Sequence, residues 1–450
     1  MQFQIRPELI EKIQTLVNTQ NDKELHLHLN DLHYADIADI LEELSLDQAT
    51  YIIKLLDTET TSDVLMEINE DDREKILNNF SPKEIADELE EMDSDDAADI
   101  LAEFSEKEQE EIIANIEDEE HAADIQELLG YDEDSAGGLM AKELVKVRET
   151  WTVAGCVREM RRQAEYVTRV HSIYVVDKQD KLIGRLSLKD LLTADAKAKI
   201  ADIYIPRVDF VNVHTDGEEV AKIMQKYDLE AIPVVDEIGR LVGRVTIDDI
   251  VDFIKEEADK DYQLAAGISN DVEADDSILR LTKARLPWLL IGMLGGLGAA
   301  TIITGFETVM EEYVILLSFV PLIQATAGNV GVQSSAIVVQ GLANDTVKGD
   351  VFKRLLKEFG LASVNGLAIA LVVLPISHFL FKTSYLVSAT ICIALITVII
   401  IAALVGTFIP IFLDRRGVDP AVATGPFITT SNDIFGILIY FLTAKLILGF

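Results

Sequence analysis

A lone carboxylate lies within the last apolar stretch of the chain, residues 421–448. Asp433 follows three side chains that carry hydroxyl or amide oxygens: Thr429, Thr430 and Asn432. A charged residue near the middle of a membrane helix costs about 2.5–3.5 kcal/mol on insertion scales, so it normally faces water or a partner and marks an ion path. No Lys or Arg between Arg416 and Lys445 could pair with it locally. We therefore expect Asp433 to bind a cation.

A second polar run lies in the apolar stretch 313–343. It reads Gly328-Asn329-Val330-Gly331-Val332-Gln333. Small and amide residues inside a membrane permit close helix packing and interhelical hydrogen bonds, and packing alone would explain the run. Together with the Asp433 segment it predicts a polar pore between the two stretches. We expect the pore to be lined by side chains with neutral oxygens: Asn329, Gln333, Thr429, Thr430 and Asn432.

The composition of this pore favours a hard cation that keeps much of its water. Mg²⁺ dehydrates reluctantly and is usually held by one or two carboxylates, whereas Ca²⁺ takes about six to eight oxygens. Mn²⁺ or Co²⁺ is the alternative ion, but the sulfur and imidazole ligands that favour softer metals are missing from the sequence near Asp433. In a symmetric dimer, two copies of Asp433 would face one axis.

The 450-residue chain has 39 basic and 78 acidic residues, and the excess of acid is confined to one part. Residues 287–450 contain 8 Lys/Arg and 9 Asp/Glu, so 31 basic and 69 acidic residues remain for 1–286, a net charge of −38. This charge argues against nucleic acid and against an anionic membrane surface as a partner. It is explained either by a solvated acidic surface or by a surface that accumulates cations.

The sequence indicates neither an enzyme nor a soft-metal site. Cys156 and Cys392 lie in different halves, and the 7 histidines show no metal-binding spacing. No phosphate-binding loop, nucleophile motif or acid–base pair is present in the sequence, so we expect no catalytic activity. Residues 1–20 lack the apolar core of a signal peptide, so the acidic part is expected to stay in the cytoplasm.

Five apolar segments predict five transmembrane helices: 287–306, 313–343, 359–381, 386–413 and 421–448. Each reaches the roughly 20 residues needed to cross about 30 Å of hydrocarbon. Basic residues gather before the first segment and in the loops after the second and fourth, the last of these with Arg415 and Arg416. Such loops stay in the cytoplasm. This predicts a multi-pass protein of the inner or plasma membrane with cytoplasmic N-terminal domains and an outer C-terminus.

Residues 1–130 read as a series of short helices. A short motif recurs with its aspartate spaced by 24, 24, 12 and 25 residues, at Asp39, Asp63, Asp87, Asp99 and Asp124. A unit of 24 residues fits two short helices with tight connections and predicts an α-solenoid. The recurring aspartates are interpreted as helix caps or as solvated side chains.

Residues 131–257 contain a tandem repeat. Ser187 and Asp190 align with Thr246 and Asp249 at the same offset, 59 residues. Each copy reads as strand, turn, strand and helix, and the unit resembles a CBS domain. The resemblance implies an α/β CBS pair that binds ATP or another adenine nucleotide, with Thr246 and Asp249 at the ribose. Many CBS pairs instead bind no nucleotide and act as dimerising regulators.

The order of these parts resembles the MgtE family of Mg²⁺ channels and transporters. It runs from an acidic helical N-domain through a CBS pair and a connector to a membrane domain, here residues 1–130, 131–257, 258–286 and 287–450. The stretches Gly328–Gln333 and Gly425–Asp433 match the family's membrane motifs. The resemblance implies a homodimer in the lipid bilayer with its pore between the second and fifth membrane helices. It also implies that Asp433 binds Mg²⁺ and that the connector acts as a plug helix.

The resemblance further implies regulatory Mg²⁺ sites outside the membrane. Asp95 and Asp99 of the N-domain would face Asp249 and Asp252 of the second CBS unit. Other implied ligands lie in the CBS pair, on the plug and at the cytoplasmic mouth of the pore: Asp216, Glu218, Asp228, Glu257, Asp261 and Asp419. Lys260 stands where the family has an acidic plug residue, which predicts an altered gating threshold.

These observations predict a Mg²⁺ uptake channel or transporter that cytosolic Mg²⁺ closes. Repulsion among acidic domains opposes their docking unless cations bridge them, so abundant ion favours a plugged state. One alternative is a transporter of Mn²⁺ or Co²⁺. The other is a membrane-anchored CBS nucleotide sensor, which would need no carboxylate at Asp433.

Overall fold

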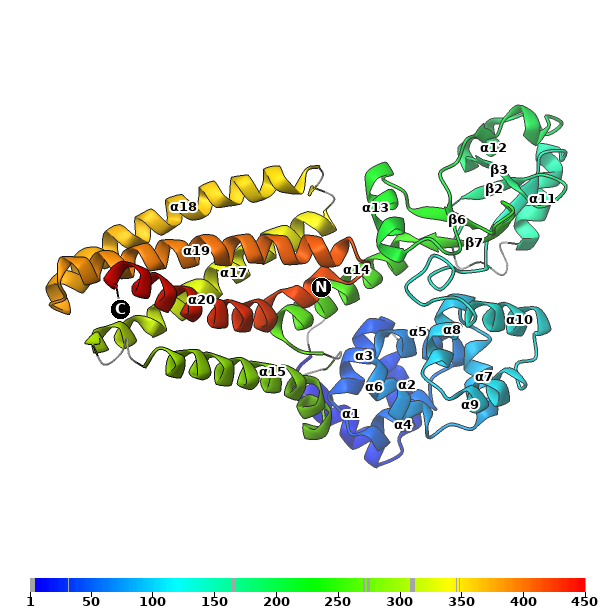
Figure 1. Ribbon diagram of the computed structural model, residues 1–450. Helices are drawn as coiled ribbons and strands as arrows, with labels where there is room; N and C mark the ends of the chain where they lie inside the picture. Colours follow the sequence, from blue (N-terminus) through cyan, green and yellow to red (C-terminus); the bar gives the residue numbers. More distant parts are fainter. Residues whose placement is uncertain are drawn as a thin grey trace. The chain divides into compact units, whose positions relative to one another are not determined.

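The chain forms two compact units, Met1–Ile254 and Lys255–Phe450, in a computed structural model (Figure 1). The first unit holds the acidic helices and the sheets, and the second holds the long apolar helices. The structure describes residues 5–30, 32–163, 167, 169–170, 172–269, 272, 276–307, 312–344, 346–347 and 349–449.

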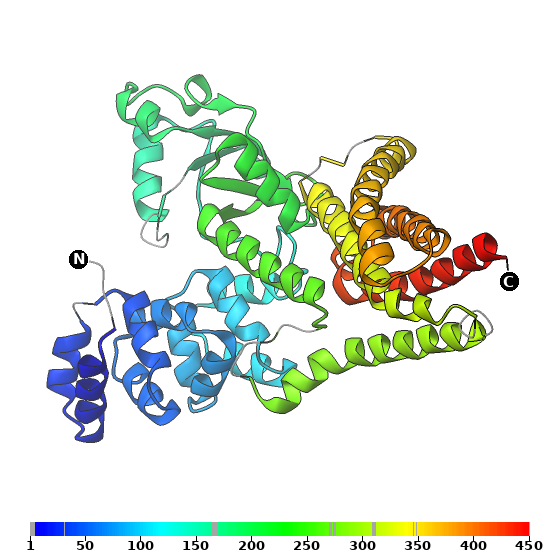
Figure 2. The ribbon, with the colours of Figure 1, turned by 90° about the vertical axis from the view of Figure 1, so that its left-hand side faces the viewer.

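Short helices stacked on one another build the first part of the first unit, coloured blue to cyan in Figure 2. They are α1 (Pro7–Asn18), α2 (Asp22–Leu29), α3 (Tyr34–Glu42), α4 (Leu46–Ile53), α5 (Thr58–Glu67), α6 (Glu70–Leu77), α7 (Pro82–Leu89), α8 (Ser94–Ala102), α9 (Glu106–Ile113) and α10 (Glu119–Leu128). Ser45, Ser81 and Ser105 each begin a capping box, which satisfies backbone donors at a helix start. The predicted helical solenoid is confirmed.

The aspartates of the 24-residue repeat occupy the same position within their helices. Asp57, Ser81 and Asp93 are the N-cap residues of α5, α7 and α8, and each stands six residues before a repeat aspartate (57 to 63, 81 to 87, 93 to 99). The repeat aspartates therefore lie inside helices, and their interpretation as helix caps is wrong. Those with exposed side chains, as expected for solvated residues, are Asp39, Asp63, Asp87 and Asp99.

Two small sheets follow, one for each copy of the tandem repeat, with strand orders β1-β2-β3-β4 and β5-β6-β7. The strands are β1 (Val145–Arg148), β2 (Ile173–Val176), β3 (Leu182–Leu186), β4 (Ile205–Pro206), β5 (Val211–Asn212), β6 (Ala231–Val235) and β7 (Leu241–Thr246); the helices are α11 (Val153–Gln163), α12 (Leu188–Thr193) and α13 (Gly217–Tyr227). Ile173 pairs with Leu186, and Ile232 pairs with Val245, each 59 residues further on. The strands therefore pair in the same register within each copy.

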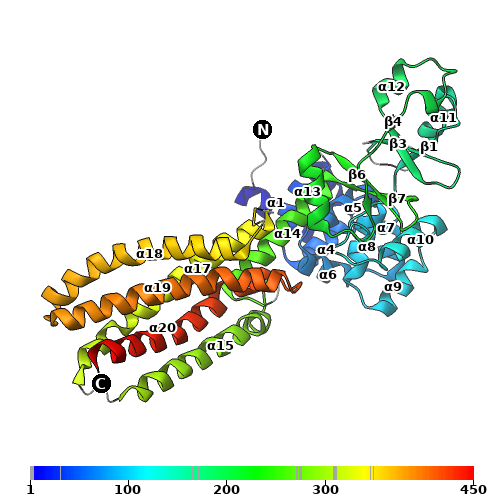
Figure 3. The same cartoon turned by 45° about the horizontal axis from the view of Figure 1, so that its top comes forward.

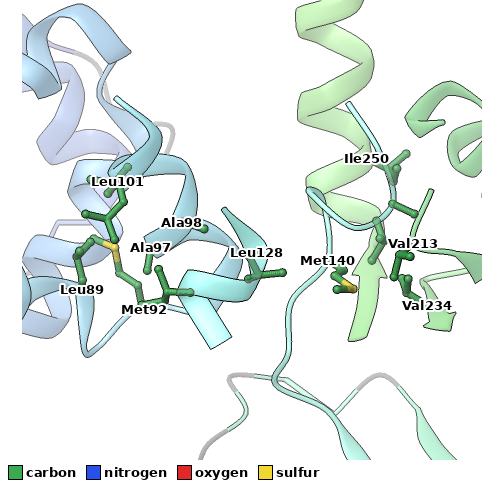
Figure 4. Packing of buried hydrophobic residues seen from close by; sticks show 14 of the residues in the cluster. Leu89, Met92, Ala97, Ala98, Leu101, Leu128, Met140, Val213, Val234 and Ile250 are labelled. Carbon is green, nitrogen blue, oxygen red and sulfur yellow. The ribbon is translucent and has the colours of Figure 1, made fainter. Parts of the chain in front are cut away.

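One hydrophobic core joins the helices to the second sheet (Figure 4). It contains Ala97 of α8 and Leu128 of α10 together with Met140, Val234 of β6 and Ile250. Burial of such side chains stabilises the contact by about 25 cal/mol per Å² of apolar surface. Because this core fixes α8 against the second CBS copy, polar residues along its edge acquire defined neighbours.

Five long apolar helices form most of the second unit (Figure 3). They are α15 (Ile278–Gly305), α17 (Val320–Ala343), α18 (Val351–Pro375), α19 (Tyr385–Asp414) and α20 (Gly425–Leu448). A 3₁₀ turn (Val314–Phe319) precedes α17, a π-helical turn (Ile376–Leu380) follows α18, and another 3₁₀ turn (Pro420–Ala423) precedes α20. All five are long and apolar enough to cross a membrane, which confirms the predicted number of spans.

The connector expected over 258–286 is not one continuous helix. α14 (Ile247–Ala266) leaves the last CBS strand as a single helix and ends at Gly267, whose φ of +80° is left-handed. Two backbone hydrogen bonds close this end as a Schellman motif: Gly267 N to Leu264 O at 3.0 Å and Ile268 N to Gln263 O at 2.9 Å. A second helix, α15, then begins after its N-cap Ser277.

Candidate metal sites

Asp433 lies in the third turn of α20 and faces α17. The helix begins at Gly425 with Pro426 in its first turn, so Asp433 is nearer to the helix start than the sequence pattern indicates. A methyl group added to Gly328 would lie 3.9 Å from Oδ1 of Asp433 and 3.3 Å from Cγ2 of Thr429. The Asp433 carboxylate and the Thr429 methyl group therefore share the face of α20 that meets the glycine backbone of α17, and the Thr429 hydroxyl donates to the carbonyl oxygen of Gly425 at 2.9 Å.

The other predicted pore residues of α20 pack against neighbouring helices. Asn432 is 2% exposed, and its Nδ2 donates to the carbonyl oxygen of Ala327 at 3.4 Å. Its amide also lies directly against Gly331, where no side chain would fit. The methyl group of Thr430 packs in the same way on Gly295 of α15. Within the single chain, Asn432 and Thr430 thus hold helices together rather than line an open surface.

The amides predicted on α17 point away from the buried side of the helix. Exposed residues recur at spacings of 4, 4, 3 and 4, at Ala325, Asn329, Gln333, Ala336 and Gln340. This is the period of one helix face. Gly328 and Gly331 are buried on the other side. An amide stripe on a helix that can cross a membrane needs a polar neighbour, because lipid offers no hydrogen-bond partner.

A second group of carboxylates lies where α8 meets the CBS pair. Asp93, Asp95 and Glu143 each place one oxygen within 4.8 Å of the others. Asp95 is only 7% exposed, and among the described residues its Oδ1 has no hydrogen-bond partner. A buried acceptor without a donor costs about 1–3 kcal/mol, and more if it is charged. This oxygen is therefore available to a cation, and carboxylates are the ligands that Mg²⁺ prefers.

Burial and mutual repulsion raise the pKa of the carboxyl groups around this triad. Burial raises the pKa of Asp95 well above its usual range, and the nearby charges of Asp96 and Asp249 add to the effect. Burial followed by the charge of Asp249 raises the pKa of Asp96 to about 8. Burial also raises the pKa of Asp249 and of Glu143. Burial and repulsion therefore favour a bound proton or a bound cation at these carboxyl groups.

Hydrogen bonds and one arginine position the cluster. Ser94 donates from its backbone N and its Oγ to Oε2 of Glu143, at 3.2 and 2.9 Å. These bonds tie the start of α8 to the segment that precedes β1. The guanidinium of Arg244, which is 4% exposed, lies 3.5 Å from Oδ2 of Asp93. Arg244 balances part of the negative charge, but Oδ1 of Asp95 still has no donor among the described residues.

Models of protein families match the chain in the order of its parts. The MgtE intracellular N domain matches residues 32–134, the CBS domain matches 136–197 and 200–256, and the MgtE domain of divalent cation transporters matches 320–443. The magnesium transporter MgtE of Thermus thermophilus is 38% identical over 334 residues, 74% of each chain. The chain belongs to the MgtE family.

Other magnesium transporters and channels show the same likeness. The magnesium transporter MgtE of Bacillus subtilis is 36% identical over 318 residues, 70% of each chain. A crystal structure of the cytosolic domain of the Mg²⁺ channel MgtE in complex with ATP has 35% identity and a TM-score of 0.52, and it covers 54% of this chain and 99% of that one. The soluble part of a magnesium transporter has 31% identity and a TM-score of 0.50, covering 56% and 98%.

In this MgtE chain, the ligands expected between the N-domain and the CBS pair are only partly brought together. Asp95 and Asp249 are electrostatic neighbours, as expected. Asp99 and Asp252 are both exposed, although the charge of Asp99 helps to raise the pKa of Asp96. The structure adds residues that the sequence analysis missed, namely Asp93, Asp96 and Glu143. Asp93, Asp95 and Asp96 are close together in the sequence, and this spacing could have indicated the cluster. Glu143 comes from another domain, and nothing in the sequence links it to them.

The carboxylates expected within the CBS pair of this MgtE chain lie at opposite ends of α13. Asp216 is the N-cap residue and accepts from the backbone N of Glu218 at 3.0 Å. Asp228 is the C-cap residue, in a left-handed conformation. The 11 residues of α13 lie between them. The rise of the helix over this length is roughly 18 Å, so they cannot share an ion within one chain. Glu218 forms an ion pair with Lys222 at 2.8 Å.

The expected plug ligands lie on α14 and before α20. Glu257 pairs with Lys260 at 2.8 Å, so the basic residue at the unusual position neutralises a neighbouring plug carboxylate. Asp261 is exposed on the same helix. Asp419 caps the 3₁₀ turn before α20, accepting from the backbone N of Ala421 at 2.7 Å.

The end of α14 touches the start of α20 through two glycines. A methyl group on Gly425 would collide with the carbonyl oxygen of Ala265, and one on Gly267 would collide with the ring of Pro426. Both glycines have positive φ, +42° and +80°. Only glycine permits both the backbone conformation and the close approach. The connector therefore contacts the first turn of the helix that carries Asp433.

The predicted ribose-binding pair of the second CBS copy belongs to the acid cluster. Thr246 donates from its N and Oγ1 to Oδ2 of Asp249, at 3.1 and 2.5 Å. Asp249 in turn faces the carboxylates of α8. In the first copy, Ser187 is the N-cap residue of α12 without a side-chain cap hydrogen bond, and Asp190 follows in the first turn.

Proposed function

We propose that this protein mediates Mg²⁺ uptake through a membrane path that cytosolic Mg²⁺ closes. The observation that carries the proposal is the position of Asp433, which faces the backbone of Gly328 between two helices that can cross a membrane. A carboxylate, the Thr429 hydroxyl and nearby backbone offer hard oxygen ligands, which suit a divalent cation that stays partly hydrated. Relatives that are magnesium transporters support Mg²⁺ as this cation.

The driving force is the electrochemical gradient. A divalent cation gains about 4.6 kcal/mol when it moves inward across −100 mV, which is twice the value per unit charge. Closure by cytosolic Mg²⁺ requires the acidic unit to lie in the cytoplasm, which is the orientation that the basic loops predict. The same orientation would place the C-terminus outside.

Two exposed surfaces support a homodimer. The amide stripe of α17, with Asn329 and Gln333, would be covered by a polar face of a second copy.

In the CBS pair, Leu188 and Leu192 are 48% and 74% exposed. Their equivalents 59 residues on, Ile247 and Val251, are 39% and 56% exposed. Equivalent apolar residues on both copies of the repeat fit a self-complementary interface. Such a dimer would bring two copies of Asp433 to one axis.

The acid cluster supports closure by the transported ion. A cation held by Asp93, Asp95 and Glu143 would bridge the N-domain to the CBS pair and offset the burial and repulsion that raise the pKa of Asp95 and of Glu143. Asp249, beside this cluster, stands in the first turn of α14, and Ala265 near the end of α14 touches Gly425. A stabilised contact between the N-domain and the CBS pair would thereby favour one position of α14, the helix that touches α20.

An adenine nucleotide would tune this response. The ATP complex of a related cytosolic domain supports nucleotide binding. Because Asp249 is engaged with Thr246 and the α8 carboxylates, we place the ribose at Ser187 and Asp190 of the first copy rather than at Thr246 and Asp249. Loss of ATP binding in Asp249→Ala but not in Asp190→Ala would contradict this placement.

Uptake into liposomes that contain the purified protein tests the proposal. We expect uptake of Mg²⁺ that exceeds uptake of Mn²⁺ and Co²⁺, and we expect Asp433→Asn to abolish most of it. Thr301→Val on α15, whose hydroxyl only bonds its own helix at Leu297, is the matched membrane control. Preferential Mn²⁺ or Co²⁺ uptake would support the alternative substrate, and no ion uptake at all would support an anchored nucleotide sensor.

A further inference from the structure

Another carboxylate of the membrane unit lies on α18. Glu358 is the eighth residue of this helix and is half-buried. Ser334 of α17 is 6% exposed, and its Oγ donates to Oε1 of Glu358 at 2.7 Å. Among the described residues, Glu358 forms no ion pair within 4.0 Å. Glu358 directly precedes the apolar stretch 359–381, at the end of the part of α18 that can cross a membrane, and the buried Ser334 is its hydrogen-bond partner.

The hydrogen bond ties the peripheral helix α18 to α17, the helix that carries the amide stripe. α18 packs mainly against α19. Hydrogen bonds to a charged acceptor are roughly twice as strong as those between neutral groups, and the burial of Ser334 keeps most water away from the bond. The bond is therefore suited to hold one helix in a fixed rotation relative to another.

The opposite face of α17 packs closely on α19 and α20. Gly406 lies against the carbonyl oxygen of Gly331, and Nδ2 of Asn432 donates to the carbonyl oxygen of Ala327 at 3.4 Å. On the side that faces α18, the bond from Ser334 to Glu358 adds a second polar anchor for α17. Successive residues on a helix lie about 100° apart, so fixing Ser334 also fixes the direction of its neighbour Gln333.

We propose that Glu358 is a positioning residue for ion conduction, acting through Ser334 to aim Gln333 and, one turn earlier, Asn329 at the pore. The inference rests on the proposed Mg²⁺ path and adds a residue that contacts neither Asp433 nor the ion. Its role requires an acceptor for the serine hydroxyl, and a neutral amide oxygen can supply one.

Flux through proteoliposomes of four variants tests this role. Glu358→Ala and Ser334→Ala should each raise the half-saturating Mg²⁺ concentration by about three- to tenfold, the range expected for one net hydrogen bond. The double variant should be no worse than either single one, since both remove the same bond. Glu358→Gln should stay within about twofold of the parent. Additive single effects, or a Gln variant as impaired as the Ala variant, would overturn the proposal.

A control and a second readout separate positioning from folding. Ser363→Ala on α18 removes a hydroxyl that bonds only the helix's own Phe359 O, at 2.7 Å, and should change nothing. Both native cysteines are buried, so a thiol introduced as Gln333→Cys can be labelled selectively with a charged reagent. Labelling should slow in the Glu358→Ala background, and unchanged labelling would refute the role. Absence of Mg²⁺ flux in the parent would refute the proposed function instead.

Discussion

At the scale of the residue, the proposed control by Mg²⁺ depends on Asp95. This side chain is 7% exposed, and its Oδ1 has no hydrogen-bond partner within the described part of the chain. Asp95→Asn keeps the shape but removes the charge and the proposed metal ligand. We expect the cytosolic Mg²⁺ concentration for half-closure to rise about tenfold or more, the scale seen when groups that support a metal site are removed.

The measurement is Mg²⁺ flux as a function of Mg²⁺ on the cytoplasmic face. Asp39→Asn is the matched control, because Asp39 occupies a repeat position of the same solenoid but is exposed on α3. An Asp95→Asn protein that closes at the parent's concentration would show that the buried cluster does not sense the ion.

Lys260 gives a second prediction at this scale. Its ion pair with Glu257, at 2.8 Å, neutralises a carboxylate on the connector. Exposed pairs of this kind are worth about 0.2–1 kcal/mol, so Lys260→Gln should lower the half-closing Mg²⁺ concentration by at most about fivefold. The control is Lys75→Gln, which breaks a similar pair with Asp72 on α6. A higher half-closing concentration in the Lys260 variant would contradict the assignment of Glu257 as a Mg²⁺ ligand.

At the scale of the element, the contact between α14 and α20 makes the connector a candidate gate. Gly425→Ala would place a methyl group against the carbonyl oxygen of Ala265. We expect this variant to keep conducting at Mg²⁺ concentrations that close the parent, because the clash penalises only the docked connector. Flux at high cytosolic Mg²⁺ is the readout.

Backbone strain needs its own control, since Gly425 has a φ of +42°. Gly417 also has a positive φ, +69°, but an added methyl group there would meet nothing within 4 Å. Gly417→Ala therefore carries strain without the clash and should close normally. If both variants fail to close, strain rather than the contact is responsible.

Elements that repeat or that follow a single hydrophobic period could be predicted from the sequence. The five membrane helices and the tandem CBS register are of this kind, because each depends on local pattern alone. Residues that meet only after folding could not be predicted. Glu143 joins Asp95 across a domain boundary, and Glu358 joins Ser334 across two helices. The break after Gly267 was also missed, since it depends on a left-handed backbone rather than on composition.

At the scale of the whole molecule, the charge of −39 is concentrated in the part that docks around the acid cluster. Folding raises the pKa of Asp95, Asp249 and Glu143, and raises that of Asp96 to about 8. Below about pH 4 these groups are protonated in the folded and the unfolded chain, so their contribution to stability is complete. As the pH rises toward 8 the unfolded chain ionises first, and this stability is lost.

We therefore expect Mg²⁺-free protein to open more readily between α8 and the CBS pair as the pH rises from about 5 to about 8. The loss should be on the order of a few kcal/mol, since one pKa unit corresponds to about 1.4 kcal/mol. Hydrogen exchange of α8 amides in the full chain measures it. Saturating Mg²⁺ should flatten the dependence by binding the ionised cluster, and parallel pH profiles with and without Mg²⁺ would refute a metal site there.

The central claim is that the ion which binds Asp433 in the membrane also closes its own path from the cytoplasm. Mg²⁺ flux into proteoliposomes, recorded against cytosolic-side Mg²⁺ for the parent and for Asp433→Ala, tests it most directly. The parent should conduct at low Mg²⁺ and close as Mg²⁺ rises, and the variant should stay silent at every concentration. Equal flux in the variant, or a parent whose flux ignores cytosolic Mg²⁺, would contradict the claim.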